Sequence, residues 1–382
     1  MQIKTIVRGK YMKKRPTLII DHEKLRDNMK TVVGWCSEAG IDVAGVFKVT
    51  GGLASTALDY EACGAKWIAS SRLEQLARAK EAGVKIPLLM IRVPMLSELD
   101  EMVKVCEYSL QSEFATLKAL DEAAIRAGKI HNVILMIDLG DLREGFFDPE
   151  ELVDVAKYTD EVLTGLNLAG IGTNLGCYGS VIPTGKKMKQ LAETAEAVEA
   201  AIGRPLEIVS GGATSSLMPV FDGVMPSKVN MLRIGGAAFV GSLEETCRIY
   251  KRKELEALHD DAITLEAEVI EVRTKPTHPI GELGVNAFGK KATYKDRGNR
   301  RRALLAIGGA DFGDIGDILP QLEGSEVLGC SGDHTILDIE DCKEKIRVGD
   351  VIRFKLHYSA ILNLSSSENV TKHEVGEIGV LL

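Results

Sequence analysis

Apolar and polar positions follow a regular pattern over the first two thirds of the chain. From residue 17 to about residue 240, short runs of apolar and β-branched residues recur at fairly even intervals. Between them lie segments in which apolar residues return every three or four positions, the period of an α-helix, as in residues 71–83 and 185–203. Strands that are apolar throughout and alternate with helices indicate a parallel sheet covered by helices.

Eight of these runs follow an opening strand at residues 17–20 and a helical stretch that ends at Ala39. They are residues 43–49, 67–70, 86–93, 108–112, 133–140, 166–174, 206–212 and 231–236. Eight strand-helix units over about 240 residues match a (β/α)8 barrel. A doubly wound open sheet has the same periodicity and remains the structural alternative.

The pattern changes beyond Leu265. Short alternating or β-branched runs follow, separated by Gly, Pro and Asp, with few helical segments. We therefore predict an α/β protein with two domains, a barrel in residues 1–255 and a β-rich domain in residues 256–382. Residues 289–303 are dense in charge and lack apolar periodicity, so they form either a solvated loop or a functional arm.

Composition narrows the class of partner and the compartment. The chain has 382 residues, 55 acidic and 47 basic, and the resulting formal charge of -8 disfavours nucleic acid and anionic membranes as partners. No run approaches the ~18 apolar residues of a membrane span, and the N-terminus lacks the pattern of a secretory signal. The seven cysteines are scattered without a CxxC pair, which is typical of reduced thiols. We expect a cytoplasmic protein.

One lysine interrupts the apolar stretch AGVFKVTGG, residues 44–52. Lys48 is predicted near the carboxyl end of the first barrel strand, where barrel enzymes carry functional side chains. Partial desolvation lowers the pKa of a lysine, and its free amine is then a nucleophile for a carbonyl carbon. A lysine at a strand end can also extend its charged group into water, and position alone does not exclude that structure.

Two glycine-containing stretches favour the reactive lysine. VSGGATS (209–215) ends the seventh predicted barrel strand and RIGGAAF (233–239) ends the eighth. The loops after strands seven and eight are the recurrent phosphate site of this fold. A lysine on the first strand together with such a site describes a phosphorylated aldehyde cofactor, pyridoxal 5'-phosphate (PLP).

The chain resembles the alanine racemase-like, fold type III PLP enzymes, and within them most closely the ornithine racemase branch. The motifs that carry the resemblance are PTLIIDHEKLRDNMK, VFKVTGG, IDLGDLREGF, GIGTNLGCYG, VSGGATSSL, LRIGGAAFVG, SGDHTILDIED and HYSAILNLSS. They span nearly the whole chain, and DLGDLREG and SGDHTILD indicate the ornithine-type branch. The resemblance implies a PLP-dependent racemase that exchanges the α-proton of a free amino acid between two bases, with ornithine or lysine as the favoured substrate.

The resemblance also implies roles for individual residues. Lys48 is expected to hold the cofactor and to act as acid and base on one face of the substrate. Arg233 is expected to face the pyridine nitrogen, where its permanent charge keeps that nitrogen unprotonated. Arg143 is expected near the phenolic oxygen of the cofactor and the substrate carboxylate. The other expected cofactor-binding residues are Asn174, Ser210, Gly211, Gly212, Thr214, Gly235, Gly236 and Tyr358.

Each of these residues taken alone also has an ordinary structural explanation, such as an ion pair or a turn. Their joint occurrence in the right order favours the cofactor site.

The second base departs from the pattern of alanine racemase, which supplies a tyrosine from the partner subunit. Phe288 occupies that neighbourhood here, and a phenylalanine cannot carry a proton. Asp333 and His334 are expected to replace it, with Tyr294 behind them. Because the family completes its site across subunits, a homodimer with shared active sites is expected.

Two other functions remain possible at this stage. A PLP- and metal-dependent D-amino-acid lyase, of the D-threonine aldolase or D-serine dehydratase type, would use Cys330, Asp333 and His334 as a divalent-metal cluster. The chain lacks the short-spaced His and Cys pair of those enzymes, and we predict no metal site. A non-enzymatic PLP carrier lacks a second domain, which the residues after Thr264 supply here.

Overall fold

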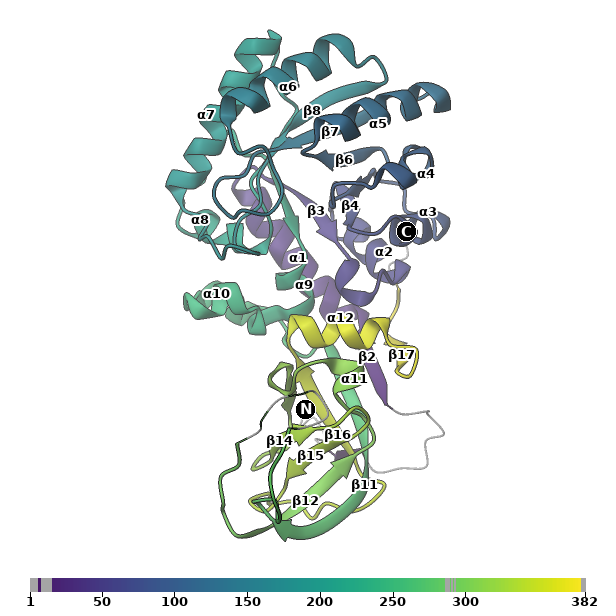
Figure 1. Cartoon of the computed structure of the whole chain (residues 1–382), viewed down its shortest axis with the longest axis vertical. Coiled ribbons are helices and arrows are strands. Elements are labelled where there is room, and N and C mark those ends of the chain that lie inside the picture. The colour runs from purple at the N-terminus through teal and green to yellow at the C-terminus, as the bar shows by residue number, and fades with distance from the viewer. Residues whose placement is uncertain (1–5, 8–15, 286–288, 290, 292, 379–382) are drawn as a thin grey trace. The chain divides into compact units, whose positions relative to one another are not determined.

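The computed structural model describes residues 6–7, 16–285, 289, 291 and 293–378 (Figure 1). These residues divide into two compact units. The barrel unit comprises residues 22–259 together with 377–378, and the β-rich unit comprises residues 6–7, 16–21 and the described part of 260–376. The opening strand, which the apolar pattern placed with the barrel domain, therefore belongs to the β-rich unit.

Eight parallel strands close into a barrel. Each strand pairs with its neighbour in sequence, and β10 pairs with β3 to complete the ring. The strands are β3 (Asp42–Val46), β4 (Trp67–Ser70), β5 (Leu88–Met90), β6 (Tyr108–Gln111), β7 (His131–Met136), β8 (Leu166–Gly172), β9 (Ile208–Ser210) and β10 (Met231–Ile234). Each of the eight predicted runs overlaps one of these strands, so the (β/α)8 barrel is confirmed and the open sheet is excluded.

Helices connect the strands and cover the outside of the barrel (Figure 1). The longer ones are α1 (His22–Glu38), α2 (Ala54–Ala62), α3 (Leu73–Glu81), α4 (Leu99–Val105), α5 (Phe114–Ala127), α6 (Pro149–Val162) and α7 (Gly185–Ile202). Short helices α8 (Leu217–Phe221), α9 (Gly236–Val240) and α10 (Glu245–Ile249) follow β9 and β10. Among the described residues, no helix has the length and apolar character needed to cross a membrane.

Successive side chains of a strand point to opposite faces of the sheet. The barrel strands therefore contribute to two apolar layers, one inside the barrel and one between the strands and the surrounding helices. Ala44 and Val46 of β3 belong to the cluster that fills the barrel, with Ala69, Leu89, Leu110, Ile134, Met136, Ala169, Ile208 and Met231. Val43, which precedes Ala44 and points the other way, packs outward with Val32 and Cys36 of α1. Apolar side chains fill the interior of the barrel, so a site for a ligand is expected at the end of the barrel and in its loops.

The second unit is rich in β-strands, as the sequence pattern predicted, and most of its strand pairs are antiparallel. The long strand β11 (Ile263–Pro276) pairs with β2 (Thr17–Asp21), β12 (Asn299–Leu305) and β16 (Val351–Leu356). The remaining elements are β1 (Ile6–Val7), α11 (Gly309–Phe312), β13 (Ile318–Pro320), β14 (Glu326–Cys330), β15 (Thr335–Asp338), α12 (Tyr358–Ser366) and β17 (Thr371–Val375).

The charged segment 289–303 is neither all loop nor all arm, because its last residues form β12. Arg300 of this strand donates to Asp338 of β15 at 2.6 Å, and Arg297 pairs with the same carboxylate at 3.2 Å. Cross-strand ion pairs thus replace the apolar periodicity that normally marks a strand.

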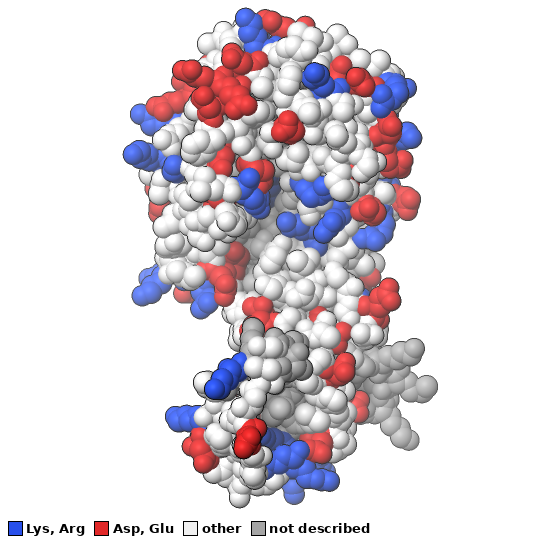
Figure 2. Space-filling model, in the orientation of Figure 1, with Lys and Arg blue, Asp and Glu red and all other residues white. Residues whose placement is uncertain are grey.

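Charged side chains of both signs are interspersed over the face drawn in Figure 2. Several form pairs one helical turn apart, such as Lys157 with Glu161 and Lys189 with Glu193. Exposed pairs of this kind contribute little to stability, and the burial of apolar side chains contributes far more.

Candidate functional site

Lys48 lies at the carboxyl end of the first barrel strand, two residues beyond the inward-facing Val46. It begins a 3-10 turn, Lys48–Thr50, which Gly51 ends with a φ of 64°. Gly52 follows with a φ of 74°, and a Cβ there would lie 2.3 Å from the Gln75 side chain. The two glycines of the TGG sequence therefore let the chain turn away directly after the lysine.

The Lys48 amine is half-buried and makes no hydrogen bond or ion pair with any described residue. Burial lowers its pKa, and the positive charges of Arg143 and Arg233 act in the same direction, while Cys177 and Glu144 oppose them. A lysine with a lowered pKa holds its nucleophilic, neutral form over a wider pH range. The chemistry that this position can supply is attack on a carbonyl carbon.

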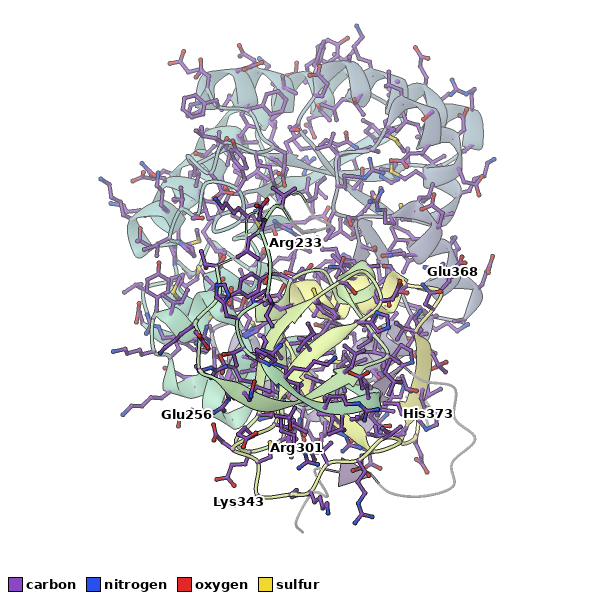
Figure 3. The ribbon with its side chains drawn as sticks, turned by 60° about the horizontal axis from the view of Figure 1, so that its bottom comes forward. Arg233, Glu256, Arg301, Lys343, Glu368 and His373 are labelled. Carbon is purple, nitrogen blue, oxygen red and sulfur yellow. The ribbon has the colours of Figure 1, made fainter. Side chains whose placement is uncertain are left out.

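Arg233 lies on β10 and is 4% exposed, so its guanidinium is inside the barrel unit (Figure 3). It donates to Ser210 Oγ at 2.5 Å, to the Thr173 carbonyl oxygen at 3.0 Å and to Asn174 Oδ1 at 3.4 Å. Burial lowers its pKa to about 10. No carboxylate of the described residues forms an ion pair with it, so Arg233 is a buried cation held by neutral groups.

Asn174 is 8% exposed and follows β8. Its Oδ1 faces Arg233, whereas its buried Nδ2 has no hydrogen-bond partner among the described residues. A buried amide donor without a partner costs about 1–3 kcal/mol. This atom is therefore available to a group that the chain itself does not provide. The sequence analysis did not single out Thr173, whose carbonyl oxygen helps to hold Arg233 beside Asn174.

Two loops at the barrel end are tied together by one carboxylate. Asp141, 1% exposed, lies in the loop after β7, and its two oxygens accept backbone N–H groups from the loop after β8. The donors are Gly176 at 3.1 Å, Tyr178 at 3.0 Å and Val181 at 3.2 Å. Asp141 thus positions the loop that carries Cys177.

Arg143 and Glu144 follow on the same loop and form an ion pair with each other. The arginine side chain is 44% exposed and that of the glutamate is 19% exposed. Burial alone would lower the pKa of Arg143, but the hydrogen bond and charge of Glu144 raise it. The charge of Glu144 also acts on Lys48 and Arg233, so this pair belongs to the same electrostatic site.

The glycine stretches after β9 and β10 meet at the same end of the barrel. The backbone N–H of Ala237 donates to Thr214 Oγ1 at 3.4 Å, and a Cβ added to Gly236 would lie 3.4 Å from that oxygen. Thr214 begins a 3-10 turn and Gly236 begins α9, and the first N–H groups of such turns have no acceptor within the helix. Gly211, Gly212 and Gly235 lie in the same two stretches, and a surface of such small residues at the start of short helices suits a phosphate.

Glu244 is a residue of this region that sequence reasoning did not single out. Its Oε1 lies 3.3 Å from a Cβ placed on Gly236, and its Oε2 accepts the Cys247 N–H at 3.0 Å. Burial raises the pKa of Glu244, which favours the neutral carboxyl. A neutral carboxyl is compatible with an anion at the neighbouring amides.

The remaining predicted residues belong to the β-rich unit and do not share a unit with Lys48. Tyr358 is the first residue of α12. Asp333 and His334 are exposed in the turn between β14 and β15, where Ser331 N–H donates to the His334 carbonyl oxygen at 2.8 Å. Phe288 lies outside the described residues.

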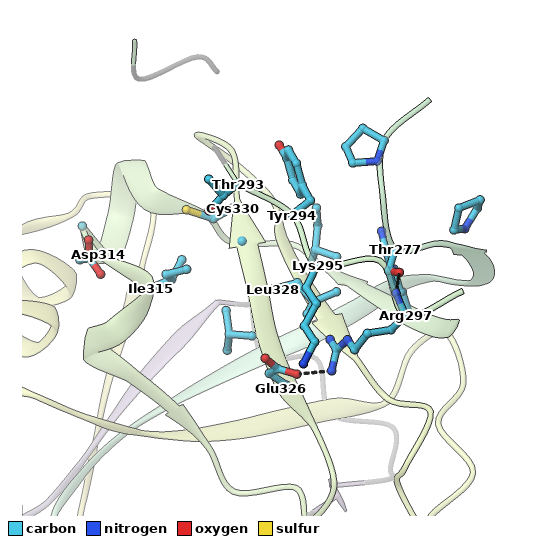
Figure 4. Close-up of a pocket in the computed structure, with 17 residues that line it drawn as sticks. Thr277, Thr293, Tyr294, Lys295, Arg297, Asp314, Ile315, Glu326, Leu328 and Cys330 are labelled. Carbon is cyan, nitrogen blue, oxygen red and sulfur yellow. Dashed lines mark hydrogen bonds and ion pairs between the residues drawn. The ribbon is translucent and has the colours of Figure 1, made fainter. Parts of the chain in front are cut away.

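The β-rich unit contains a cavity of about 990 Å³ (Figure 4). Tyr294 and Cys330 line it, together with Arg297, which pairs with Glu326 at 2.8 Å. Asp333 and His334 are not among its lining residues. Nor do Cys330, Asp333 and His334 form a group of metal ligands, and no cluster of three His, Cys, Asp or Glu side chains suited to a metal is found in the described chain.

Comparison with solved structures agrees with the observed fold. Alanine racemase from Streptomyces lavendulae superposes with a TM-score of 0.72 at 16% identity, covering 96% of this chain and 98% of that one. D-threonine aldolase from Filomicrobium marinum superposes with a TM-score of 0.70 at 18% identity, over 91% of this chain and 89% of that one. At such low identity these similarities show the fold alone.

Comparison with known sequences shows closer relatives. The ornithine racemase of Acetoanaerobium sticklandii is 37% identical over 94% of this chain and 99% of its own length. The lysine racemase of Thermotoga maritima is 38% identical over 94% of this chain and 98% of its own length. The model of the family described as alanine racemase, N-terminal domain, matches residues 20–242, more than half of the sequence. The chain therefore belongs to the alanine racemase family.

Proposed function

We propose that the chain is a PLP-dependent amino-acid racemase whose substrate carries a distal amino group, as ornithine and lysine do. The observation that carries the proposal is the Lys48 amine, half-buried at the end of β3 and without a partner among the described residues. The full-length similarity to an ornithine racemase and a lysine racemase supports both the reaction and the substrate class. A D-amino-acid lyase is not favoured by these relatives.

The residues at the barrel end fit the cofactor. Enzymes of the alanine racemase family depend on PLP. In the part of the chain that the structure describes, one end of the barrel carries an amine of lowered pKa, a buried cation without a carboxylate partner and an Asn174 Nδ2 without a hydrogen-bond partner. The small residues and amides around Gly212, Thr214 and Gly236 would hold the phosphate. When bound, the cofactor supplies an aldehyde for amines and a ring that withdraws electrons from the bond to the α-hydrogen.

The chain's own residues then have distinct tasks. Lys48 would hold the cofactor and carry a proton to and from the α-carbon on one face of the substrate. Arg233, fixed by Ser210 and Thr173, would place its charge at the pyridine nitrogen and keep a proton away from it. Arg143 would bind the substrate carboxylate as a planar donor.

Racemisation also needs a proton carrier on the opposite face. We assign this role to Asp333 and His334 of a second copy of the chain, in a homodimer with shared sites. Their exposure in the turn between β14 and β15 supports the assignment, because a residue that acts on another subunit must reach the surface of its own unit. Tyr358 would reach the phosphate from the β-rich unit. The compartment we propose is the cytoplasm, since all seven cysteines are free thiols.

The experiment that tests this function uses single enantiomers of ornithine, lysine, alanine and serine in deuterium oxide. Chiral chromatography with mass detection is expected to show the opposite enantiomer of ornithine or lysine, with one deuterium at the α-carbon. Release of an aldehyde or keto acid, or inversion without deuterium, would overturn the proposal.

A matched pair of lysine variants tests the site itself. Lys48→Met is expected to abolish racemisation and the yellow absorbance of the holoprotein, and to prevent labelling of the barrel by PLP and borohydride. Lys66→Met removes an exposed lysine of the same unit and is expected to behave as the wild type. Retention of the absorbance and of the borohydride adduct in Lys48→Met would show that another residue holds the cofactor.

A further inference from the structure

A substrate with a distal ammonium group needs a carboxylate at the barrel end, and this inference rests on the proposed function. We propose that Glu144 binds the distal ammonium, and that its ion pair with Arg143 opens when the substrate binds. The substrate carboxylate then takes the place of Glu144 on Arg143, and the substrate ammonium takes the place of Arg143 on Glu144.

Most other carboxylates in the described loops after the barrel strands already have structural tasks. Glu98 binds Arg92 at 2.7 Å and the Met95 N–H at 2.8 Å. Glu113 and Asp148 accept backbone N–H groups at the starts of α5 and α6. Glu244 lies beside the glycines assigned to the phosphate. None of these four is a suitable receptor for an ammonium near Lys48.

Besides Asp148, the loop after β7 contains three carboxylates, and two of them accept hydrogen bonds from the backbone. Asp138 accepts the N–H groups of Gly140 at 2.8 Å and Leu142 at 3.1 Å. Asp141 is buried and uses both oxygens for three amides of the neighbouring loop. An ammonium bound to Asp141 would compete with the contacts that hold the two loops together, and one bound to Asp138 would compete with the turn at Gly140. Glu144 is the carboxylate of this loop whose partner is an exposed side chain.

The surroundings of Glu144 suit exchange of one ion pair for another. Its side chain is 19% exposed, so a substrate can reach it, and its partner Arg143 is 44% exposed. Its charge acts on both Lys48 and Arg233, which places the carboxylate near the reacting lysine. An amino acid with one carboxylate and a second ammonium offers both new partners at once, so neither residue of the pair is left unpaired. An amino acid with a neutral side chain of equal length offers only its carboxylate to Arg143, and Glu144 is then left without a cationic partner.

The test compares ornithine with norvaline, which is the same amino acid without the terminal ammonium. Four holoenzymes are compared: the wild type, Glu144→Gln, Glu144→Asp and Glu151→Gln. For each, kcat and KM are measured with ornithine and with norvaline, or the affinity for norvaline is measured as competitive inhibition of ornithine turnover. In Glu144→Gln the preference for ornithine over norvaline is expected to fall by about 10- to 100-fold, mainly through KM, because a charge-assisted hydrogen bond is lost. Glu144→Asp is expected to retain part of the preference. Glu151→Gln removes the same charge from an exposed site on α6 and should keep it.

Two results would overturn the inference while the proposed function stands. Equal losses for ornithine and norvaline in both Glu144 variants would show that Glu144 acts only by positioning Arg143. An unchanged preference in Glu144→Gln would place the ammonium on another carboxylate. Failure of the wild type to racemise any amino acid would instead overturn the proposed function, and this inference with it.

Discussion

Arg233 donates a hydrogen bond of 2.5 Å to Ser210 Oγ across the neighbouring barrel strands β10 and β9. Both side chains are buried, and the second contact of the guanidinium is the Thr173 carbonyl oxygen at 3.0 Å. A carboxylate at this place would neutralise the cation, whereas a hydroxyl and a carbonyl orient it and leave its charge available. The pair therefore holds a positive charge ready for a group from outside the chain.

Removal of the hydroxyl in Ser210→Ala is expected to lower the free energy of unfolding by about 1–3 kcal/mol, because a buried charged donor loses its acceptor. Affinity for PLP should fall as well, since Arg233 is no longer oriented. Urea unfolding and cofactor titration measure the two effects. Ser37→Ala, on the exposed end of α1, is the control and should change neither; equal stability of both variants would contradict the role given to Ser210.

Lys48 should make the stability of the apoprotein depend on pH. Burial lowers its pKa in the folded state below the ordinary 10.5, so the unfolded chain binds more protons between the two values. Stability therefore rises with pH through that range, and the cost of the buried charge is fully present below the folded pKa. Lys48→Met apoprotein is expected to be more stable than the wild type at neutral pH, with the difference disappearing as the pH approaches 10.5. Urea midpoints at several pH values check this, and a difference independent of pH would contradict it.

Replacement of Asp141 should loosen the two loops. In Asp141→Ala the N–H groups of Gly176, Tyr178 and Val181 lose their acceptors, and we expect a loss of about 2–4 kcal/mol in unfolding free energy. Amide hydrogen exchange should accelerate in residues 173–184 before the barrel strands are affected. The exposed Asp154→Ala serves as control. Unchanged exchange in the loop would show that it does not depend on this carboxylate.

The same substitution at two glycines should have opposite effects. Gly212 has a φ of 116° and a Cβ there would lie 2.6 Å from Ser216 Oγ, so Gly212→Ala is expected to destabilise the fold by about 1–3 kcal/mol and to weaken cofactor binding. Gly34 lies within α1, and a Cβ there meets nothing within 4 Å. Gly34→Ala should stabilise by about 0.5–1 kcal/mol. Thermal unfolding of the two variants measures the sign directly.

His131 should limit stability in mild acid. Burial lowers its pKa to about 4, with a smaller contribution from Lys129, and its Nε2 lies 2.9 Å from Ser109 Oγ. The unfolded chain protonates first as the pH falls from 6.5 to about 4, so stability is lost over that range, by up to roughly 3 kcal/mol. His131→Gln is expected to show a smaller acid loss in urea unfolding between pH 7 and 4. Parallel curves for the variant and the wild type would contradict this assignment.

Much of the barrel could be predicted from local pattern. A strand that is buried on both faces is apolar throughout, and a covering helix repeats its apolar residues every turn, so both are visible in a short window of sequence. The position of Lys48 and of the paired glycines at strand ends followed from the same pattern. The unit to which the strand Thr17–Asp21 belongs did not, because its partners β11 and β17 lie more than 200 residues away in the chain.

The amino-acid sequence by itself determined the eight strand-helix repeats, the β-rich remainder and the residue types gathered at the strand ends, because each depends on periodicity or on a short motif. Only the tertiary structure decided which groups are free to act. Asp141 and Glu144 are three residues apart on one loop, yet the first is saturated by backbone amides and the second pairs with an exposed arginine. The availability of a charged group depends on the partners that folding brings to it, and these partners come from distant parts of the chain.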